Sequence, residues 1–370
     1  MSHEYLWYLP NTVESGHRLD DTPGGWADLD QATRLARLLE DHGWGGALIG
    51  TSWGRPDTFT VATAIAARTS SFKPLAAIRP GYWQPAHFAS AAATLDHFTG
   101  GRLLINVVSG QDDFPAYGDS EGDQAQRYAR TKEFLQIVRK LWSQDNVTFS
   151  GEYFGVEDST LRLKPHGADE GRHPRLYFGG ASPAAERVAA TEADVQLFWG
   201  EPLDGVAQRI DRLKALQEEL GREHQPLEFG LRITTLVRDT SDEAWRDAEQ
   251  RVAVMAERAG RKDHGQAGLA GAPEGRGPGG KRWGGAVGQQ RLLALHERGE
   301  VLDSCLYTTP GKFGGGGAGT TWLVGSHDEV AAALRKYAGL GITHFVLSDT
   351  PYLEEAARVG DHLLPRLRGN

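Results

Sequence analysis

Strand-like and helix-like segments alternate along almost the whole of this 370-residue chain. Short apolar runs such as residues 103–108 (LLINVV) have the length of buried strands. Each run is followed by a longer segment whose apolar residues recur every three or four positions, the spacing of a helix with one buried face. Eight strands are expected, at 5–9, 47–49, 75–78, 103–108, 176–178, 195–198, 229–237 and 345–347.

Eight strand–helix units in one chain of this length predict an α/β fold, a closed (β/α)8 TIM barrel that spans residues 1–370 as a single domain. A doubly wound open sheet is the main alternative. It is disfavoured because no glycine-rich fingerprint stands between the first strand and the first helix. Residues 147–163 are expected to form a small β excursion from this pattern.

A glycine-rich stretch, residues 260–320, separates the seventh expected strand from the eighth. A segment of this composition is not expected to bury enough apolar surface to order itself. One interpretation is a floppy surface insertion. We favour a mobile lid over the barrel mouth, because long loops in compact domains usually carry function.

Composition narrows the classes of partner. The net charge is −9 without a basic stripe, so no nucleic-acid partner is expected. Cys305 is the single cysteine, which excludes disulfides within the chain and favours a reducing compartment. The first residues lack the pattern of a signal peptide, and no apolar stretch approaches the roughly 20 residues of a membrane span. We therefore expect a cytoplasmic protein without a membrane partner.

Active sites of such barrels lie at the C-terminal ends of the strands. The residues there are small hydroxyl residues, glycines, aromatics and arginines, a set that suits a large planar ligand with a phosphate. In Gly179-Gly180-Ala181-Ser182-Pro183, glycines precede a serine N-cap and a proline at the first helical position. An ordinary capped turn would have the same form. Arg127 and Tyr128, after a loop, could add a cation and a hydroxyl.

Familiar catalytic signatures are missing. The sequence contains no HExxH or cysteine-based metal motif and no GxxxxGK[ST] loop. No metal is therefore expected, and an organic cofactor is the best explanation of the polar mouth.

Several segments resemble the two-component alkanesulfonate monooxygenases of the bacterial luciferase-like superfamily. They include AATLDHFTGGRLLINVVSG, QRYARTKEFLQIVRKLW, LYFGGASPAAERVA, LFWGEP, EFGLRITTLVRDTSDEAW, AVGQQRLLALH, GGAGTTWLVG and GITHFVLSDTPYLEEAARVG. The resemblance covers nearly the whole chain. It implies the same barrel, with a mobile insertion before the last strand.

The resemblance also implies a reaction. An NAD(P)H-dependent flavin reductase would supply reduced FMN (FMNH2), which with O2 would cleave a sulfonate into sulfite and an aldehyde. Relatives are usually dimers or tetramers, so a homo-oligomer is expected. By position, the residues expected to bind the flavin are Thr51, Ser52, Asn106, Ser109, Arg127, Tyr128, Gly180 and Ser182. Arg232 matches an active-site arginine that could hold the sulfonate through paired hydrogen bonds.

The chain departs from the family at four positions. Thr234 stands where the family has a histidine, Thr350 replaces a tyrosine, Gly315 replaces a lid arginine, and the cysteine after the second strand is absent. Arg232 and Thr234 are the catalytic candidates. The smaller side chains predict a wider mouth. Its expected substrate-binding residues besides Arg232 are Trp53, Gln84, Trp199 and Tyr352, with Trp83, Asp112 and Asp113 as further lining.

Aromatic faces beside amides and carboxylates suit a polyhydroxylated ligand, so the leading substrate hypothesis is the sulfo-sugar sulfoquinovose. Dimethyl sulfone fits the same departures. Positive charge lost from the lid could come from Lys281, Arg282 or Arg291. Two other classes stay open: a different flavin barrel, such as a deazaflavin-dependent dehydrogenase or a ring-opening oxygenase, and a non-catalytic flavin carrier or sugar-binding protein.

Overall fold

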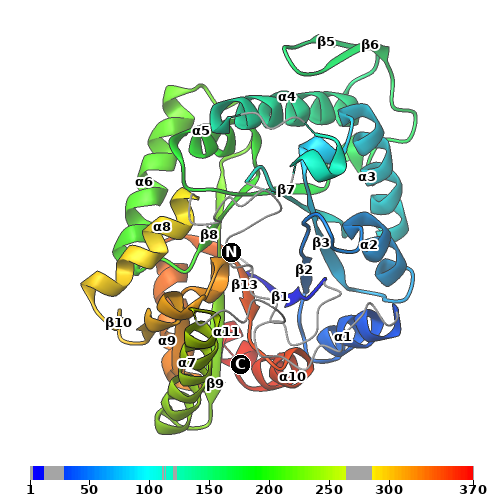
Figure 1. Ribbon diagram of the computed structural model, residues 1–370. Helices are drawn as coiled ribbons and strands as arrows, with labels where there is room; N and C mark the ends of the chain where they lie inside the picture. Colours follow the sequence, from blue (N-terminus) through cyan, green and yellow to red (C-terminus); the bar gives the residue numbers. More distant parts are fainter. Residues whose placement is uncertain are drawn as a thin grey trace.

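The eight expected strands form a closed parallel ring, because β13 returns to pair with β1 (Figure 1). The computed structural model describes residues 3–11, 29–110, 112, 114–119, 123–263 and 286–369. In ring order the strands are β1 (Glu4–Leu9), β2 (Gly46–Ile49), β3 (Lys73–Ile78), β4 (Leu104–Val107), β7 (Arg175–Gly179), β8 (Val195–Trp199), β9 (Glu228–Arg238) and β13 (Ile342–Ser348). The predicted TIM barrel is confirmed.

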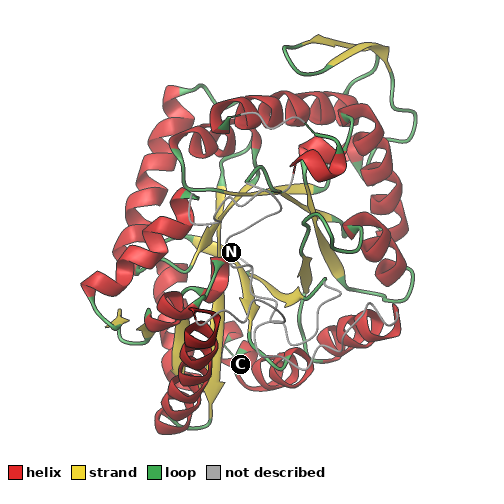
Figure 2. Cartoon of the chain, viewed as in Figure 1, coloured by secondary structure: helices red, strands yellow, loops and turns green. Residues whose placement is uncertain are grey.

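Helices surround this ring on its outer side (Figure 2). They are α1 (Leu29–Asp41), α2 (Thr58–Ala66), α3 (Pro85–Thr99), α4 (Gln124–Ser143), α5 (Pro183–Glu192), α6 (Leu203–Glu219), α7 (Ser241–Asp263), α9 (His327–Gly339), α10 (Tyr352–His362) and α11 (Leu364–Arg368). The expected β excursion is the antiparallel hairpin of β5 (Val147–Ser150) and β6 (Gly155–Ser159), which projects beyond α4 in Figure 1.

Short-range signals set the ends of several helices. The Ser182 hydroxyl accepts a hydrogen bond from the Ala185 N–H at the start of α5. Asp123 and Gln126 form a reciprocal capping box at the start of α4. Gly100 ends α3 in the left-handed region, with a φ of 64° that glycine adopts without strain.

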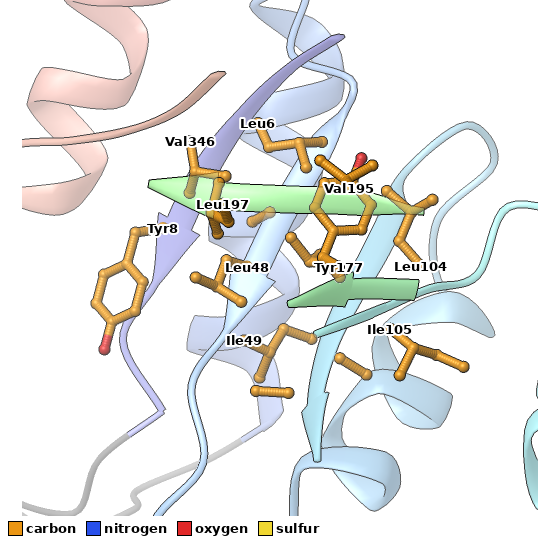
Figure 3. Close-up of a cluster of buried hydrophobic side chains, with 14 of the residues drawn as sticks. Leu6, Tyr8, Leu48, Ile49, Leu104, Ile105, Tyr177, Val195, Leu197 and Val346 are labelled. Atoms are coloured by element: carbon orange, nitrogen blue, oxygen red, sulfur yellow. The ribbon is translucent and has the colours of Figure 1, made fainter. Parts of the chain in front are cut away.

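The parallel register determines which side chains enter the barrel. Successive residues of a strand point to opposite faces, and residues paired across neighbouring strands share a face. Leu48, for example, pairs with Tyr8 on one side and with Leu75 on the other. The buried side chains inside the barrel include Leu6, Leu48, Leu104, Tyr177, Val195, Leu197 and Val346 (Figure 3). Leu75, the register partner of Leu48, is also buried. This apolar layer closes the barrel below its mouth.

A charged network lies at the opposite, N-terminal end of the strands. The Tyr177 hydroxyl is 2.9 Å from Nδ1 of His344, whose Nε2 is 2.6 Å from a Glu228 oxygen. Arg175 pairs with the same carboxylate at 2.8 Å. The hydrogen bond from His344, together with Arg175, lowers the pKa of Glu228 to about 2 against the opposing effect of burial.

The glycine-rich stretch departs from expectation over residues 286–320. This part contains α8 (Val287–Ala294), β10 (Val301–Leu302), β11 (Leu306–Tyr307) and short 3-10 turns. Leu292, Leu306 and Tyr307 are buried, so scattered apolar residues supply the burial that the glycine content seemed to deny. The prediction that the whole stretch cannot order itself is therefore wrong for this part. Residues 264–285 lie outside the described residues.

Besides the two short strands β10 and β11, the sequence analysis missed a longer strand, β12 (Trp322–Ser326). β12 pairs in parallel with the second half of β9, from Thr234 to Arg238, beyond the point where β13 ends. β9 has 11 residues and is long enough to serve both the barrel and this added strand. The β10–β12 segment is thereby attached to the barrel at the level of its mouth.

We expect Glu228→Gln to flatten the pH dependence of stability in acid. The folded pKa lies below the unfolded value, so the carboxylate stabilises the fold above about pH 4.3 and loses this effect as pH falls towards 2. Because the Glu228 side chain is 41% exposed, solvent screening limits the loss at pH 7 to about 1 kcal/mol. Urea denaturation from pH 7 to pH 2 measures both quantities.

The matched control is Glu219→Gln, which removes an exposed partner of Arg187. It should leave the pH profile of unfolding unchanged. If the free energy of unfolding had the same pH dependence in wild type and in Glu228→Gln, the lowered pKa of Glu228 in the folded state would be contradicted.

Candidate active site

The inward-facing layer at the C-terminal ends of the strands combines small, aromatic and polar side chains. In strand order these residues are Tyr8, Gly50, Ala77, Asn106, Gly179, Trp199, Arg232, Thr234 and Ser348. Gly50, Ala77 and Gly179 lack bulky side chains, so this layer leaves more room than the aliphatic layer below it. The side chains at the mouth are therefore more polar and less bulky than the apolar side chains below them.

Arg232 is the cation of this layer. Its register partners are Trp199 on β8 and Val346 on β13. The guanidinium carbon lies 4.8 Å from the ring centroid of Tyr8, a cation–π distance. The Tyr8 ring is in turn 5.9 Å from that of Tyr352, which is buried at the start of α10. The structure thus brings together Arg232, Trp199 and Tyr352 as expected and adds Tyr8, which the sequence analysis missed.

Thr234 lies one inward position further along β9. Its hydroxyl donates to the Ala318 carbonyl at 3.0 Å and lies 3.5 Å from the Ser348 hydroxyl. The hydroxyl proton is committed to Ala318, so this geometry favours attachment of the insertion rather than proton transfer. The expectation that Thr234 takes part in catalysis receives no support from its contacts.

A group of hydroxyls connects β4, α4 and the loop after β7. Ser109 and Thr131 hydroxyls are 2.7 Å apart, and the Tyr128 hydroxyl is hydrogen-bonded to Ser182. Burial raises the pKa of Tyr128, which is therefore protonated and a donor at neutral pH. We call Ser109, Tyr128, Thr131 and Ser182 the hydroxyl cluster. The structure brings together three residues that the sequence assigned to one ligand and adds Thr131.

Gly180 shapes the loop beside this cluster. Its φ is 148°, and a Cβ there would lie 2.6 Å from the Cβ of Ala185 and 3.4 Å from the Tyr128 hydroxyl. Any side chain would therefore collide with α5 and crowd the hydroxyl cluster. Gly179 has no such constraint, since the nearest atom to a Cβ would be 3.9 Å away.

Asn106 presents an unsatisfied acceptor to the mouth. It is 8% exposed, and its buried Oδ1 has no hydrogen-bond partner among the described residues. A buried polar atom without a partner is costly, and a ligand donor would remove that cost. This atom is the clearest sign that the mouth is built for a ligand with an N–H or O–H group.

Arg127 opens α4 beside the hydroxyl cluster. Its guanidinium carbon is 5.3 Å from the ring centroid of Phe114. A small pocket here is lined by Arg79, Arg127, Arg130, Ser109 and Thr131, among others. Arg79 pairs with Asp112 at 2.9 Å, and Arg130 pairs with both oxygens of Asp119. The pocket is a region of positive charge that is partly balanced by carboxylates.

Asp112 joins the loops that follow β2, β3 and β4. It accepts hydrogen bonds from the Tyr82 hydroxyl at 2.7 Å and from the Trp53 backbone N–H at 3.1 Å, and it pairs with Arg79. Burial, followed by the bond to Asp112, raises the pKa of Tyr82. Ser52 approaches the same carboxylate at 3.5 Å. Asp112 therefore acts as a structural link, a role that no sequence pattern indicated.

The remaining predicted residues are spread more widely. Thr51 and Ser52 are half-buried after β2, and Trp53 is 50% exposed with its ring 5.8 Å from that of Tyr117. The Trp83 ring packs 5.5 Å from that of Phe59 on α2 and 5.8 Å from that of Phe88 on α3, and its place in the lining of the mouth stays a prediction. Gln84 is the exposed N-cap residue of α3 and is not brought to Arg232. Asp113 lies outside the described residues.

The described part of the insertion lies against Trp199. A Cβ at Gly288 of α8 or at Gly317 would contact the indole at 3.5 Å and 3.7 Å respectively. Gln289 links the two segments by accepting from the Gly317 N–H at 2.8 Å. The insertion thus forms one wall of the mouth, and a Cβ at either position would make an ordinary van der Waals contact with the ring.

The charges expected from the insertion are placed differently. Arg291 donates to Glu201 at 2.5 Å instead of facing Arg232, because that buried carboxylate needs a cation. Lys281 and Arg282 lie outside the described residues. At Gly315, a Cβ would be 2.5 Å from the Gly319 carbonyl, so this backbone has no room for the arginine of the family.

Among the described residues, no group of three histidine, cysteine or carboxylate side chains could hold a metal ion. None of the helices described is both long and apolar enough to cross a membrane.

Comparison with known proteins shows the family of the chain. Residues 4–344 match the family described as luciferase-like monooxygenases. DmoA from Hyphomicrobium sulfonivorans has a TM-score of 0.74 at 18% identity, with 100% of this chain and 88% of that chain covered. EDTA monooxygenase from Chelativorans sp. BNC1 has a TM-score of 0.72 at 16% identity, covering 100% and 94%.

A riboflavin lyase crystallised with modified FMN and riboflavin has a TM-score of 0.72 at 19% identity, covering 100% of this chain and 92% of that chain. Structural likeness at such identities shows the barrel fold alone. The family match, in contrast, extends over most of the sequence and includes the strands that carry Asn106 and Arg232. The chain belongs to the luciferase-like monooxygenase family.

Proposed function

We propose that this protein is a monooxygenase that uses reduced FMN and O2 to cleave the C–S bond of an organosulfonate. One observation carries the proposal. A buried unsatisfied acceptor (Asn106), a hydroxyl cluster and a cation (Arg232) converge on one barrel mouth. A flavin needs a donor–acceptor partner and an anion site, and a sulfonate needs a cation.

The residues present fit FMN. Asn106 Oδ1 would accept from a flavin N–H, and the hydroxyl cluster with Arg127 would hold the phosphate. Gly180 supports this assignment, because the missing side chain leaves the Tyr128 hydroxyl accessible from the loop. Thr51 and Ser52 would border the ring. We propose that an NAD(P)H-dependent flavin reductase supplies the reduced cofactor, since no glycine-rich dinucleotide fingerprint follows the first strand.

Arg232 is the proposed sulfonate ligand. A guanidinium matches two sulfonate oxygens through paired hydrogen bonds, and the Tyr8 ring holds the guanidinium in place by a cation–π contact. Trp199 and Tyr352 would shape the rest of the pocket. Aromatic faces beside polar groups suit a polyhydroxylated substrate, and sulfoquinovose is our leading candidate.

Bound reduced FMN supplies two electrons for the activation of O2. The substrate carbon would supply the other two electrons: a C–H bond is replaced by bonding to one oxygen atom, which stays in the aldehyde, sulfite leaves with the C–S electron pair, and the other oxygen atom leaves as water. The protein's part is to bind the anion, orient its carbon and exclude water. We propose that the insertion, residues 260–320, performs the last task as a lid, with its described part already against Trp199.

We expect Gly180→Ala to impair FMN binding. The added methyl meets Ala185 at 2.6 Å in a backbone conformation that alanine rarely adopts, so the loop must shift, at a cost of about 1–3 kcal/mol. Gly339→Ala, at the end of α9, is the control, because its methyl has space and Gly339 lies outside the barrel mouth. Fluorescence titration with FMN and thermal denaturation measure the two effects. Equal FMN affinity in both variants would remove the loop from the cofactor site.

Sulfite release tests the reaction itself. The assay combines purified protein with FMN, NADH, a flavin reductase and O2, and offers sulfoquinovose, octanesulfonate or methanesulfonate. Dimethyl sulfone is scored by product analysis. Sulfite from sulfoquinovose alone would support the proposed substrate, and sulfite from the alkyl compounds would replace it. If the protein binds flavin but forms no sulfite or other product from any of these compounds, C–S cleavage would be contradicted.

Arg232→Met is expected to lower kcat/KM for the sulfonate about 100-fold or more, because a charge-assisted pair in a desolvated site is lost. Arg232→Lys should recover only part of this loss, since an ammonium cannot make the paired contact. FMN affinity is the internal control and should stay within about twofold. Unchanged kcat/KM in Arg232→Met would assign sulfonate binding elsewhere.

A further inference from the structure

Arg209 on α6 is buried among acceptors from three elements. It is 2% exposed, and each of its three nitrogen groups has a different partner. Nε donates to Glu186 at 3.1 Å, Nη1 to Glu201 at 2.7 Å and Nη2 to the Gly180 carbonyl at 2.6 Å. The guanidinium carbon also lies 4.6 Å from the ring centroid of Phe198. Such complete saturation fixes the side chain in one position.

Both carboxylates of this network have a second arginine. Arg212 binds both oxygens of Glu186 at 2.6 Å, and Arg291 of the insertion binds Glu201 at 2.5 Å. Neutralisation of Glu186 and Glu201 therefore does not require Arg209. What Arg209 alone among these arginines provides is a hydrogen bond to the loop after β7.

Gln196 acts on the same carbonyl. Its Nε2 donates to Gly180 O at 3.1 Å, and its buried Oε1 has no hydrogen-bond partner among the described residues. Gln196 follows the inward-facing Val195 on β8, so it faces the helical layer, as does Arg209. Two donors outside the barrel wall thus hold the Gly180 carbonyl outward.

Peptide geometry gives this anchoring a consequence for the mouth. In a trans peptide the C=O and the following N–H point in opposite directions. With the Gly180 carbonyl held towards α6, the Ala181 N–H points the other way, towards the side on which the hydroxyl cluster lies. A backbone N–H so directed is a donor for an anion bound at that cluster.

We propose that Arg209 and Gln196 are positioning residues for the phosphate of FMN. They act by locking the Gly180–Ala181 peptide so that the Ala181 N–H is presented to the phosphate, without contacting the cofactor themselves. This inference rests on the proposed function in one respect, because it takes the bound anion to be the FMN phosphate. It assigns no role in the C–S cleavage.

The experiment compares FMN with riboflavin, which lacks the phosphate. Arg209→Met removes the donor to Gly180 while Glu186 keeps Arg212 and Glu201 keeps Arg291. We expect FMN affinity to fall about tenfold, the value of one charge-assisted hydrogen bond, with riboflavin affinity changed less than about twofold. Fluorescence titration of each full-length variant with both flavins measures the ratio.

Arg212→Met is the matched control. It removes another arginine of Glu186 that has no bond to Gly180, so the preference for FMN over riboflavin should stay at the wild-type value. A purely structural role of the network predicts instead that Arg209→Met and Arg212→Met weaken both flavins alike. Thermal denaturation of each variant accompanies the titrations.

Gln196→Met keeps the test decisive if Arg209→Met does not fold. It replaces a buried amide whose oxygen has no described partner, so little stability is at stake. We expect a loss of FMN preference of about threefold, since a neutral donor is weaker than a charged one. Wild-type preference in the folded variants would overturn the proposal.

The two hypotheses fail differently. Wild type that binds FMN no better than riboflavin would overturn the positioning proposal and leave the C–S cleavage to be judged by sulfite release. Wild type that binds neither flavin would overturn both.

Discussion

The alternation of side chains around a closed parallel ring is the constraint on which the rest of this structure depends. Each strand sends every second residue inward, and the register aligns those residues into layers. Leu6 pairs with Val346 and Leu48 pairs with Tyr8, so all four side chains point inward, and the inward residues nearest the C-terminal ends of the strands reach the mouth. Arg232, Trp199 and Asn106 therefore meet although they are far apart in sequence. A shift of one residue in any strand would turn its mouth residue into the helical layer.

Buried charge is handled differently at the two ends of the barrel. At the N-terminal end, Glu228, His344 and Tyr177 satisfy one another and close the ring, a structural arrangement. At the mouth, Asn106 Oδ1 remains without a described partner while the surrounding carboxylates are neutralised. This contrast follows the general behaviour of such barrels, in which the N-terminal face serves stability and the C-terminal face serves chemistry.

Glycines have two opposite effects in this chain. In the insertion they remove side chains, yet the backbone at Gly288 and Gly317 still lies against the Trp199 ring. Gly180 and Gly315 occupy positions where a Cβ would collide with neighbouring atoms. Composition alone would predict a flexible backbone at all of these glycines. Packing shows that several are required by close approach, which explains why the described part of the insertion is more ordered than its composition suggests.

The amino-acid sequence by itself determined the eight strands, their helices and the level at which a site would form, because these follow from short-range apolar periodicity and from the geometry of parallel barrels. It also pointed to Ser182 and Tyr128 of the hydroxyl cluster through residue types, whereas the predicted roles of Arg232 and Ser109 came from a family resemblance. Tyr8, Thr131, Asp112 and Arg209 were beyond its reach. Their roles arise from contacts between residues distant in sequence, for which no local pattern exists. The same holds for Trp83, whose packing against Phe59 and Phe88 was decided only by the tertiary structure.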